Sequence, residues 1–422
     1  MAVSQFVLLR QHLDYLQQAS SYYRELFQQH DFSPADFTSL SHLSQLPLTS
    51  KRDLAKHNRD FLAVTEEQVV DICQTSGTTG GPVTIWQTES DLQRLARNEQ
   101  LALLATGITR SDRVLIGAAL DRVFIAGLAY FLGLRRIGAT IIRAGSGQPA
   151  LVAELICQQR PNILVGVPSL LLMVARYLQE NGKTPEKMGI DKLICIGEPI
   201  RNENLTLSQL GKVLQESWSA QLFGTYASTE MATAFTDCPM GCGGHLLPEL
   251  VVAEIIDDHG NPVISGTAGE VVVTPLGVEG TPLLRYRTGD IAQLHLEPCG
   301  CGRQTPRLGP ILGRREQMLK CRGTTLFPAA ISRALEEISA VCGHYLEVSS
   351  DFDLSDRLKL VVGCRDASLS AATVSELIAA KTRVKPEVVL VTPEEIRKKT
   401  IRPELRKPVT FFDYRNCSQE QE

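Results

Sequence analysis

Between about residue 70 and residue 235, short apolar runs alternate with helical patterns, and this alternation constrains the fold of the chain most strongly. Continuous apolar runs are typical of strands that are buried on both faces, and intervening helices connect such strands in parallel. We therefore predict an α/β fold whose largely parallel sheets are covered by helices. The predicted strands span residues 113–120, 139–145, 162–167 and 192–197, and the predicted helices span residues 169–181 and 204–218.

The sequence changes character on both sides of this region. Residues 1 to about 65 show amphipathic helical patterns, in which Thr49 or Ser50 could cap a helix. Residues 250–295 contain strand-like runs separated by turn signals. These runs predict a β-rich subdomain at about residues 236–312.

The last quarter of the chain predicts a small α+β domain. Its helical patterns span residues 328–338 and 369–383, and its strand-like runs span residues 343–350, 357–365 and 387–392. We therefore expect a large N-terminal domain over residues 1–315 and a small C-terminal domain over residues 316–422.

Charge and composition exclude several classes of function. The 422 residues carry a net charge of −4 at pH 7, so no global positive field attracts nucleic acid or an anionic membrane. The N-terminus lacks the basic and unbroken apolar segments of a signal peptide, and no apolar run approaches the roughly 18 residues of a membrane span. We expect a cytoplasmic protein whose 11 cysteines form no disulfide framework.

A loop rich in Gly and Thr, TSGTTGGP at Thr75–Pro82, is the first candidate binding element. Its glycines allow backbone N–H groups to approach an anion, and its hydroxyl groups add donors, so the loop suits a phosphate chain. The lysine of a Walker A loop is absent, and the spacing differs from that of a dinucleotide-binding loop. On its own residues, the loop is equally consistent with a surface turn.

Four cysteines and one histidine fall in two short segments. The segment CPMGCGGH contains Cys238, Cys242 and His245, and the segment CGC contains Cys299 and Cys301. Thiolates and imidazole at close spacing in a reducing compartment are typical of a structural Zn²⁺ site, which takes four ligands. Five side chains therefore compete for four positions, and free thiols in two loops are the alternative.

Motifs spread along nearly the whole chain carry a resemblance to a known family. In order they are LPLTSKRDL, TSGTTG, IGEPI, YASTE, LLRYRTGDI, EPCGCGR and ILGRREQMLKCRGTTLFP. This ordered set is similar to that of the adenylate-forming enzyme superfamily, and most similar to its phenylacetate–CoA ligase branch. The resemblance implies that ATP activates a carboxylic acid as acyl-AMP, and that a thiol then displaces AMP to give a thioester. The thiol would belong to coenzyme A or to the phosphopantetheine arm of an acyl carrier protein, and a degenerate relative without turnover is a further alternative.

The resemblance also implies roles for individual residues in binding ATP. Glu230 resembles the carboxylate that holds Mg²⁺, and Thr229 resembles the hydroxyl that contacts the α-phosphate. Asp290 is similar to the ribose ligand, and Arg314 to a nearby cationic contact. The loop residues that would wrap the β- and γ-phosphates are Thr75, Ser76, Gly77, Thr78, Thr79 and Gly80, and those that would form the adenine site are Gly197, Glu198, Pro199 and Tyr226.

In the family, the small C-terminal domain is mobile and rotates between the two half-reactions about one hinge residue, which Glu316 matches. Lys320, with Arg322 and Gly323, would then help form the channel for the pantetheine thiol. Lys407 resembles the lysine that offsets charge during adenylation. Its competitors for that role are Lys398 and Lys399.

The resemblance narrows the choice of zinc ligands, because several relatives have a similar Cys and His seven residues apart followed by a C-x-C. It favours Cys238, His245, Cys299 and Cys301, with Cys242 as the alternate ligand. The phosphate loop departs from the family pattern, since Gly81 stands where many relatives have a lysine. We expect this change to weaken ATP binding without ending catalysis.

The acyl substrate is the least constrained part of the prediction. Asp121, Phe124, Gly127 and Pro168 would line the acyl pocket, and this set favours an aromatic or small cyclic carboxylic acid. Asp121 could bind an amino group on the substrate, or it could pair with Arg122. The chain could act as a homodimer.

Overall fold

A computed structural model describes residues 4–75, 82–321, 324–350, 355–365, 369–402 and 408–415. The chain divides into two compact units, Met1–Ile311 and Leu312–Glu422, and each is described by itself. The boundary drawn from the sequence, between residues 315 and 316, falls just inside the second unit. No described helix combines the length and apolar character needed to cross a membrane.

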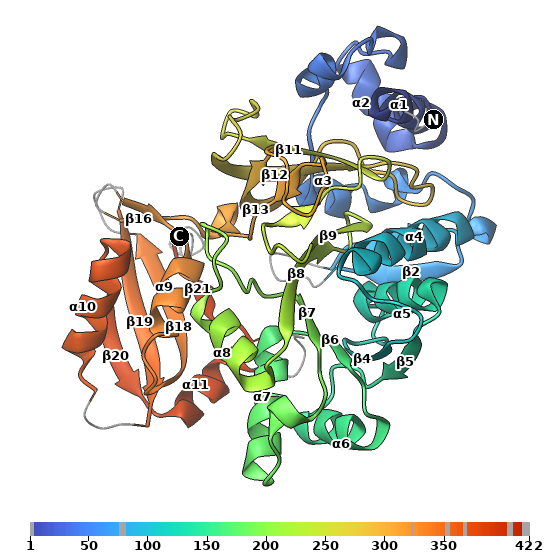
Figure 1. The fold of residues 1–422 in the computed structure, drawn as a ribbon. Coiled ribbons are helices and arrows are strands. Elements are labelled where there is room, and N and C mark those ends of the chain that lie inside the picture. The colour runs from blue at the N-terminus through green and yellow to red at the C-terminus, as the bar shows by residue number, and fades with distance from the viewer. Residues whose placement is uncertain are drawn as a thin grey trace. The chain divides into compact units, whose positions relative to one another are not determined.

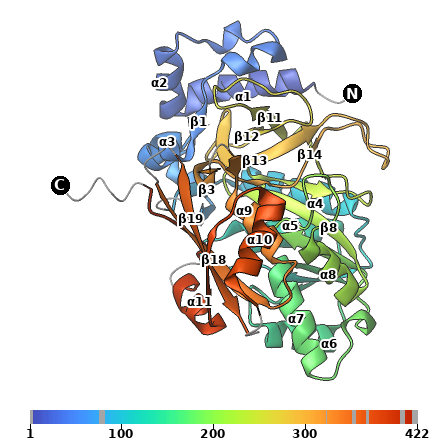
Figure 2. The ribbon, with the colours of Figure 1, turned by 90° about the vertical axis from the view of Figure 1, so that its left-hand side faces the viewer.

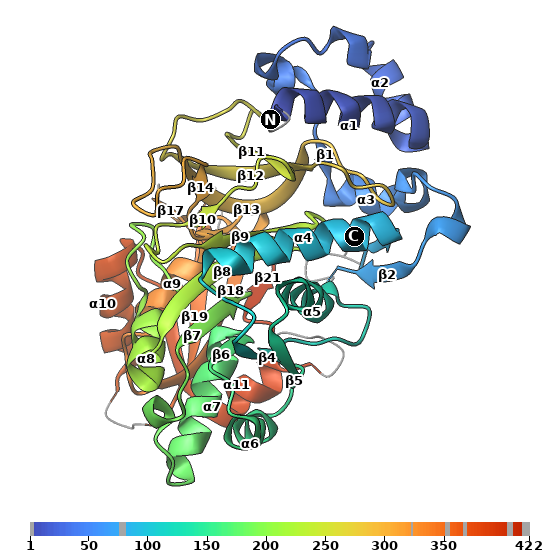
Figure 3. The same ribbon diagram turned by 45° about the vertical axis from the view of Figure 1, so that its right-hand side comes forward.

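The first unit contains a sheet whose parallel half has the strand order β8-β7-β6-β4-β5. Helices connect these strands, as the alternating pattern predicts, and Figure 3 shows α4 and α5 side by side. The predicted α/β fold is therefore confirmed. The strands are β4 (Arg113–Gly117), β5 (Thr140–Arg143), β6 (Ile163–Gly166), β7 (Lys192–Ile196) and β8 (Gln221–Ser228), and the helices are α4 (Glu89–Ala105), α5 (Ile125–Ile137), α6 (Pro149–Gln159), α7 (Pro168–Glu180) and α8 (Gln209–Trp218).

The parallel strands are buried on both faces because alternate residues point to opposite sides. Leu115 and Leu193 pack in one core with α6, α7 and α8, which includes the fully buried Trp218. Their neighbours Ile116 and Ile194 pack in a second core, with residues of α4 and α5. The near-continuous apolar runs of these strands thus provide the buried side chains on both faces of the sheet.

The structure corrects one local prediction and decides between the two cap candidates. The helix expected from residue 204 begins only at Gln209, because Asn202–Leu207 form a turn. Ser208 follows this turn and caps the start of α8. Leu205 in this turn has φ +67°, which no helix residue adopts. Of the two cap candidates, Ser50 caps α3 (Lys51–Lys56) in a capping box. The hydroxyl of Thr49 donates instead to the backbone oxygen of Leu284 at 2.7 Å.

Most of the remaining strands of the first unit are antiparallel and extend the same sheet in the order β11-β12-β13-β14-β10-β9-β8 (Figure 3). The strands β2 and β3 pair with each other in a separate two-stranded sheet. The N-terminal helices pack on this half, where Tyr15 of α1 donates to the backbone oxygen of Glu279 at 2.9 Å. The elements are α1 (Gln5–Ala19), α2 (Ser21–Gln29), β1 (Thr49–Ser50), β2 (Asp71–Gln74), β3 (Thr84–Gln87), β9 (Thr233–Asp237), β10 (Gly244–His245), β11 (Val251–Ile256), β12 (Ala268–Pro275), β13 (Tyr286–His295) and β14 (Arg307–Leu308). Short 3₁₀ helices span Pro34–Asp36, Leu40–Gln45, Asn58–Phe61, Glu66–Gln68 and Pro185–Lys187.

The second unit is an α+β body whose four-stranded sheet has the order β20-β19-β18-β21 (Figure 1). Figure 2 shows β18 and β19 of this sheet together with α9, α10 and α11. Leu358 and Leu360 face a core with α9 and α10, whereas Gly363, which points the other way, contacts Ile396 of α11. The sequence missed α11, although its capping box at Thr392 and Glu395 is a start signal. The elements are β15 (Gly313–Arg314), a 3₁₀ helix (Arg315–Gln317), β16 (Leu319–Cys321), β17 (Thr324–Leu326), α9 (Pro328–Leu335), β18 (Val341–Ser350), β19 (Asp356–Cys364), α10 (Ala371–Thr382), β20 (Glu387–Val391), α11 (Pro393–Thr400) and β21 (Phe411–Asp413).

Candidate functional site

The predicted site residues of the first unit gather at one edge of the sheet, because most of them follow the carboxyl ends of neighbouring parallel strands. Ligands of open α/β sheets bind in the crevice outside these strand ends. In sheet order, β8 precedes Thr229 and Glu230, β7 precedes Gly197, Glu198 and Pro199, β6 precedes Pro168, and β4 precedes Asp121 and Phe124.

The loop after β7 is anchored to the start of α7. Gly197 adopts φ +73°, a left-handed conformation that favours glycine and turns the chain sharply away from the strand. The carboxylate of Glu198 then accepts hydrogen bonds from the backbone N–H and the hydroxyl of Ser169, both at 2.9 Å. Glu198 therefore satisfies a free donor at the positive end of α7 and fixes the predicted adenine loop.

Tyr226 and Asp290 meet although they are 64 residues apart in the sequence. The Tyr226 hydroxyl donates to Asp290 Oδ2 at 2.8 Å, and its ring stacks on Phe235 with centroids 6.0 Å apart. Burial, and then the charge of Asp290, raises the pKa of Tyr226 well above its ordinary value. The phenol therefore stays protonated, donates its hydrogen to the carboxylate and holds Asp290 in one orientation.

The turn after β8 carries a buried hydroxyl and a partly exposed carboxylate. Thr229 is 7% exposed, and Glu230 beside it accepts a hydrogen bond from the Tyr286 hydroxyl at 3.4 Å. Burial, and then the charge of Glu230, raises the pKa of Tyr286 well above its ordinary value, so this hydroxyl also remains a donor. A carboxylate held in this way is a ligand of the type that Mg²⁺ prefers.

Thr75 closes the base of the predicted phosphate loop. Its N–H donates to the Val83 oxygen at 3.0 Å, and its hydroxyl accepts from the Val83 N–H at 3.1 Å. These two bonds bring together the chain on either side of the loop. The other residues predicted for the loop, and three predicted for later steps, lie outside the described residues: Ser76, Gly77, Thr78, Thr79, Gly80, Gly81, Arg322, Gly323 and Lys407.

The loop after β4 contains Asp121 in an exposed ion pair. Its Oδ2 lies 3.8 Å from Nε of Arg122, which is the predicted alternative to a substrate amine as its partner. Val123 has φ +51°, which is strained for a β-branched residue, and its oxygen accepts from the Gln74 N–H at 2.8 Å. The loop predicted to line the acyl pocket is thus bonded to β2, the strand that leads into the phosphate loop.

Gly127 and Pro168 have packing roles at the starts of α5 and α7. A Cβ added to Gly127 would lie 2.3 Å from the backbone oxygen of Ala119, so only glycine allows α5 this close to the loop after β4. Pro168 is buried as the first residue of α7, a position where its missing N–H costs nothing.

The predicted hinge segment lies at the start of the second unit and is fixed to that unit by Arg415. Arg415 donates to the backbone oxygens of Glu316 at 3.2 Å and Met318 at 2.9 Å. It also pairs with Asp356 at 3.3 Å, and Asp356 accepts from the Lys320 N–H at 2.6 Å. Arg314 lies in β15, directly before the hinge segment. Arg415 and Glu316 are 99 residues apart, and periodicity in a sequence carries no signal for a contact at that distance.

Lys398 and Lys399, the alternatives to Lys407 as the adenylation lysine, lie on α11, and Lys399 contacts other side chains. Lys399 Nζ is 4.7 Å from the ring centroid of Phe412 and 4.0 Å from Glu347 Oε1. Lys398 is exposed to solvent. A lysine that serves in adenylation must reach the reacting phosphate, and Lys399 would have to leave these contacts to do so.

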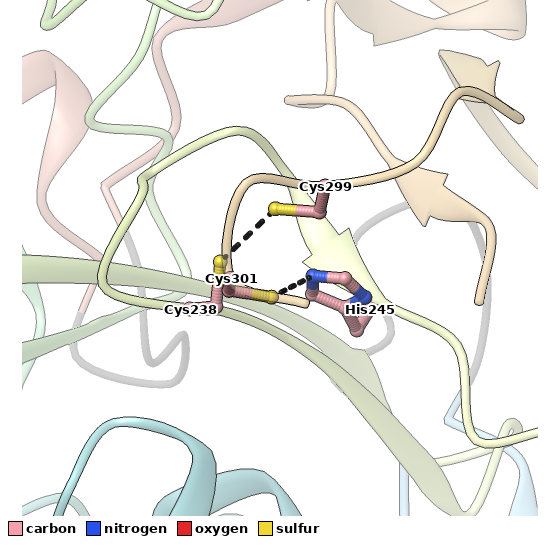
Figure 4. Close-up of side chains that lie close together, drawn as sticks. All are labelled: Cys238, His245, Cys299 and Cys301. Carbon is pink, nitrogen blue, oxygen red and sulfur yellow. Dashed lines mark hydrogen bonds between the residues drawn. The ribbon is translucent and has the colours of Figure 1, made fainter. Parts of the chain in front are cut away.

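The structure brings four of the five metal-ligand candidates together. Cys238, Cys299, Cys301 and His245 point toward one another, and their ligand atoms all lie within 4.8 Å (Figure 4). The Sγ atoms of Cys238 and Cys299 are 3.6 Å apart, and Cys301 Sγ is 3.4 Å from His245 Nε2. Cys242 lies outside the group, with its thiol 3.3 Å from the backbone oxygen of Met240.

The surroundings of His245 set the orientation of its ring and its protonation state. Its Nδ1 contacts the Thr305 hydroxyl at 3.0 Å, which leaves Nε2 directed at the cysteines. Burial, and then the charges of Arg303 and Arg307, lowers the pKa of His245 to about 4, so the imidazole is neutral near pH 7. The sequence did not single out Thr305, which lies four residues after Cys301 and could have been found as a nearby hydroxyl.

Comparison with known proteins identifies the family. A family model described as AMP-binding enzyme matches residues 16–278. Phenylacetate-coenzyme A ligase of Thermus thermophilus is 30% identical over 342 residues, which cover 80% of this chain and 75% of that protein. The chain belongs to the AMP-binding enzyme family. The predicted resemblance to the adenylate-forming superfamily is therefore confirmed.

Other relatives of this AMP-binding enzyme agree. Phenylacetate-coenzyme A ligase of Escherichia coli is 29% identical over 360 residues, covering 82% of this chain and 79% of that protein. A crystal structure of 2-hydroxyisobutyryl-CoA ligase in the postadenylation state matches with a TM-score of 0.85 at 22% identity, covering 98% of this chain and 89% of the other. A benzoate CoA ligase from Burkholderia xenovorans matches with a TM-score of 0.60 at 18% identity, covering 82% of this chain and 68% of the other. These likenesses of structure establish the fold.

Proposed function

We propose that this AMP-binding enzyme is an AMP-forming acid–thiol ligase. A carboxylate oxygen attacks the α-phosphorus of ATP, the bond to pyrophosphate breaks, and acyl-AMP forms. The thiol of coenzyme A then attacks the acyl carbon, the bond to AMP breaks, and the thioester leaves. The observation that carries the proposal is the hydrogen bond between Tyr226 and Asp290, because it joins two motifs assigned to one nucleotide at the carboxyl edge of the sheet.

Each part of the site has a role in this reaction. Asp290 accepts from the ribose hydroxyls while Tyr226 holds the carboxylate in place, and the loop at Gly197–Pro199 forms one wall for adenine. Glu230 is the residue that would hold Mg²⁺, which supplies positive charge to the phosphates. Thr229 offers its hydroxyl to the α-phosphate, and the loop that starts at Thr75 covers the departing pyrophosphate.

Lys407 is proposed as the adenylation lysine, and the two half-reactions separate its role from that of its competitors. Lys407→Ala should abolish acyl-AMP formation yet spare thioester formation from supplied acyl-AMP, because the second step makes and breaks no bond to the α-phosphorus. Lys398→Ala and Lys399→Ala are the matched controls and should adenylate normally. If the Lys407→Ala variant still formed acyl-AMP, Lys407 would not be the adenylation lysine.

The acyl substrate is proposed to be an aromatic or small cyclic carboxylic acid. The relatives that support this are named for phenylacetate and benzoate. The carboxylate of Asp121 is engaged with Arg122 in the structure, which favours an acid without an amino group. Coenzyme A is the proposed acceptor, consistent with the names of these relatives.

We further propose that Cys238, His245, Cys299 and Cys301 hold a structural Zn²⁺. Tetrahedral zinc with Zn–S bonds of about 2.3 Å and Zn–N bonds of about 2.0–2.1 Å places two sulfurs about 3.8 Å apart and sulfur and nitrogen about 3.6 Å apart. The observed separations of 3.6 Å and 3.4 Å are close to these values. A disulfide requires about 2.05 Å between sulfurs, so the 3.6 Å separation does not fit one.

Exchange of labelled pyrophosphate into ATP tests the adenylation step. Purified protein should catalyse exchange only when a suitable acid is present, and a panel of aromatic, cyclic and short aliphatic acids would identify it. Thioester formation with that acid should proceed with free coenzyme A, whereas a requirement for an acyl carrier protein would correct the acceptor. No exchange with any acid would favour a degenerate relative and contradict the proposed ligase activity.

Metal analysis tests the zinc proposal and its choice of ligands. Wild-type protein should contain one zinc per chain, and Cys299→Ser should lose most of it. Cys242→Ser is the matched control, since its sulfur lies outside the group, and it should retain the metal. Loss of zinc from both variants would argue for a different ligand set.

A further inference from the structure

The loop assigned to adenine and the loop that carries Cys238 are joined by a buried ion pair that neither motif predicts. Arg201 Nε donates to Asp237 Oδ2 at 2.8 Å, and their side chains are 14% and 6% exposed. Arg201 lies two residues after Pro199, at the end of the adenine loop. Asp237 ends β9 and directly precedes Cys238. One contact therefore connects the candidate nucleotide and metal sites inside the first unit.

Arg201 also packs directly on the turn between Cys238 and Cys242. A Cβ added to Gly241 would lie 2.3 Å from an Nη atom of Arg201 and 2.6 Å from its Cζ, so the guanidinium lies against the backbone of this turn. Arg201 donates in addition to the backbone oxygen of Leu205 at 3.2 Å. The position of the turn and the position of the adenine loop are consequently set by the same side chain.

Asp237 extends the connection to the strand that carries Tyr226. The same Oδ2 atom that binds Arg201 accepts from the Gly224 N–H at 3.0 Å. Gly224 precedes Tyr226 on β8 by two residues. A displacement of Asp237 would therefore shift both walls of the nucleotide site, the loop through Arg201 and the strand through Gly224.

We propose that Arg201 and Asp237 are positioning residues that couple metal binding at the cysteine cluster to ATP affinity. This inference rests on the proposed function. A metal bound at the cluster would hold Cys238 and, through it, the next residue, Asp237. Arg201 would carry that constraint to the adenine loop. A buried carboxylate–guanidinium pair suits this task because it is directional and costly to separate. The role of the metal thus extends beyond the stability of the loops that bind it.

The first test measures the dissociation constant of ATP for Asp237→Asn. This variant keeps the size of the side chain and removes the charge that holds Arg201. We expect the ATP dissociation constant to rise about tenfold, the loss typical of a hydrogen bond to a charged group. Zinc content should remain near one per chain, and Arg201→Lys should show a smaller rise. The kcat of Asp237→Asn at saturating ATP should change less than its KM for ATP.

Glu254→Gln is the matched control for this measurement. Glu254 is also a buried carboxylate of the first unit paired with an arginine, since it lies 3.0 Å from Arg285, but the pair does not involve the adenine loop. Its loss should lower stability without changing ATP affinity. An equal rise in the ATP dissociation constant for both variants would mean that general destabilisation explains the effect, and would overturn the proposal.

The second test removes the metal with a chelator and measures ATP binding again. In wild-type protein the ATP dissociation constant should rise about five- to tenfold, a coupling of ordinary size. In Asp237→Asn the rise should be less than twofold, because the connection is already cut. An equal rise in both proteins would overturn the coupling. Circular dichroism would detect whether chelation unfolds the protein. In that case the ATP dissociation constant of metal-loaded Asp237→Asn is the test of the proposal, and an unchanged value would overturn it.

Failure of this inference can be told apart from failure of the proposed function. Wild-type protein that binds no ATP would contradict both. Wild-type protein that binds ATP and exchanges pyrophosphate, beside an Asp237→Asn variant with unchanged ATP affinity, would contradict only the coupling.

Discussion

Replacing Glu99 by Gln should stabilise the first unit in a pH-dependent way. Glu99 lies on α4 against α5 and is 3% exposed. A Cβ added to Gly133 of α5 would fall 2.3 Å from the Cβ of Glu99, so the two helices are closely packed at this residue. Asn98 donates to one carboxylate oxygen at 3.1 Å, and among the described residues the other oxygen has no hydrogen-bond partner.

The sign of the effect follows from the pKa of Glu99. Burial raises this pKa from 4.5 to about 7, against the opposing bond from Asn98, so the folded chain retains a proton that the unfolded chain releases. The free energy of unfolding therefore falls as the pH rises from about 4.5 through about 7. With about 1.4 kcal/mol per pKa unit, the cost of folding the charged form is about 3 kcal/mol at pH 8 and below about 1 kcal/mol at pH 5.

Urea unfolding of the wild type and Glu99→Gln at pH 5 and pH 8 measures this difference. The stability of the variant relative to the wild type should increase by about 2.5 kcal/mol between the two pH values. Any fixed cost of burying the amide cancels in this comparison. Glu89→Gln, an exposed change on the same helix, is the control. A relative stability of Glu99→Gln that does not change with pH would refute the assignment of a raised pKa to Glu99.

Three further changes test separate parts of the account. Tyr226→Phe removes the hydrogen-bond donor to Asp290 and should raise the KM for ATP about tenfold, the loss expected for a bond to a charged acceptor. An unchanged KM would contradict the proposal that Asp290 binds the ribose. Arg415→Met frees the segment after Glu316 and should slow thioester formation from acyl-AMP while pyrophosphate exchange continues; equal loss of both would refute a role in the hinge. Val123→Gly relieves a left-handed valine and should raise the unfolding free energy by about 1 kcal/mol, measurable as a higher Tm; a lower Tm would show that the side chain outweighs the strain.

The sequence predicted the fold because its information was local and periodic. The strands β4, β6 and β7 could be predicted from their own apolar residues alone. A strand that is buried on both faces reads as a continuous apolar run, whatever strands lie beside it. The start of α8 was placed too early because residues 204–207 contain no proline or glycine to mark the turn. In this turn the backbone bridge between Arg201 and Leu207 sets the conformation. Helical propensity, which depends on single residues, does not report such a contact.

The sequence allowed the residues of the candidate site to be assigned motif by motif, but it did not reveal the contacts between them. Tyr226 and Asp290 were each assigned from a motif, but nothing in the sequence shows that they share a hydrogen bond. The pair of Arg201 and Asp237 was missed entirely, because ordinary charged residues between motifs carry no signature. Side-chain pairs across a sheet depend on register over tens of residues, which a single sequence does not specify.

Transfer of oxygen-18 from the acid to AMP tests whether the enzyme activates a carboxylate as acyl-AMP. The acid identified by the exchange panel would be labelled in its carboxylate oxygens and converted with ATP and coenzyme A, and the products would be analysed by mass spectrometry. Attack of the carboxylate on the α-phosphorus leaves one labelled oxygen in AMP when the thiol departs with the acyl group. We expect AMP with a single oxygen-18 and unlabelled pyrophosphate. Label in inorganic phosphate together with ADP, or AMP without label, would contradict it.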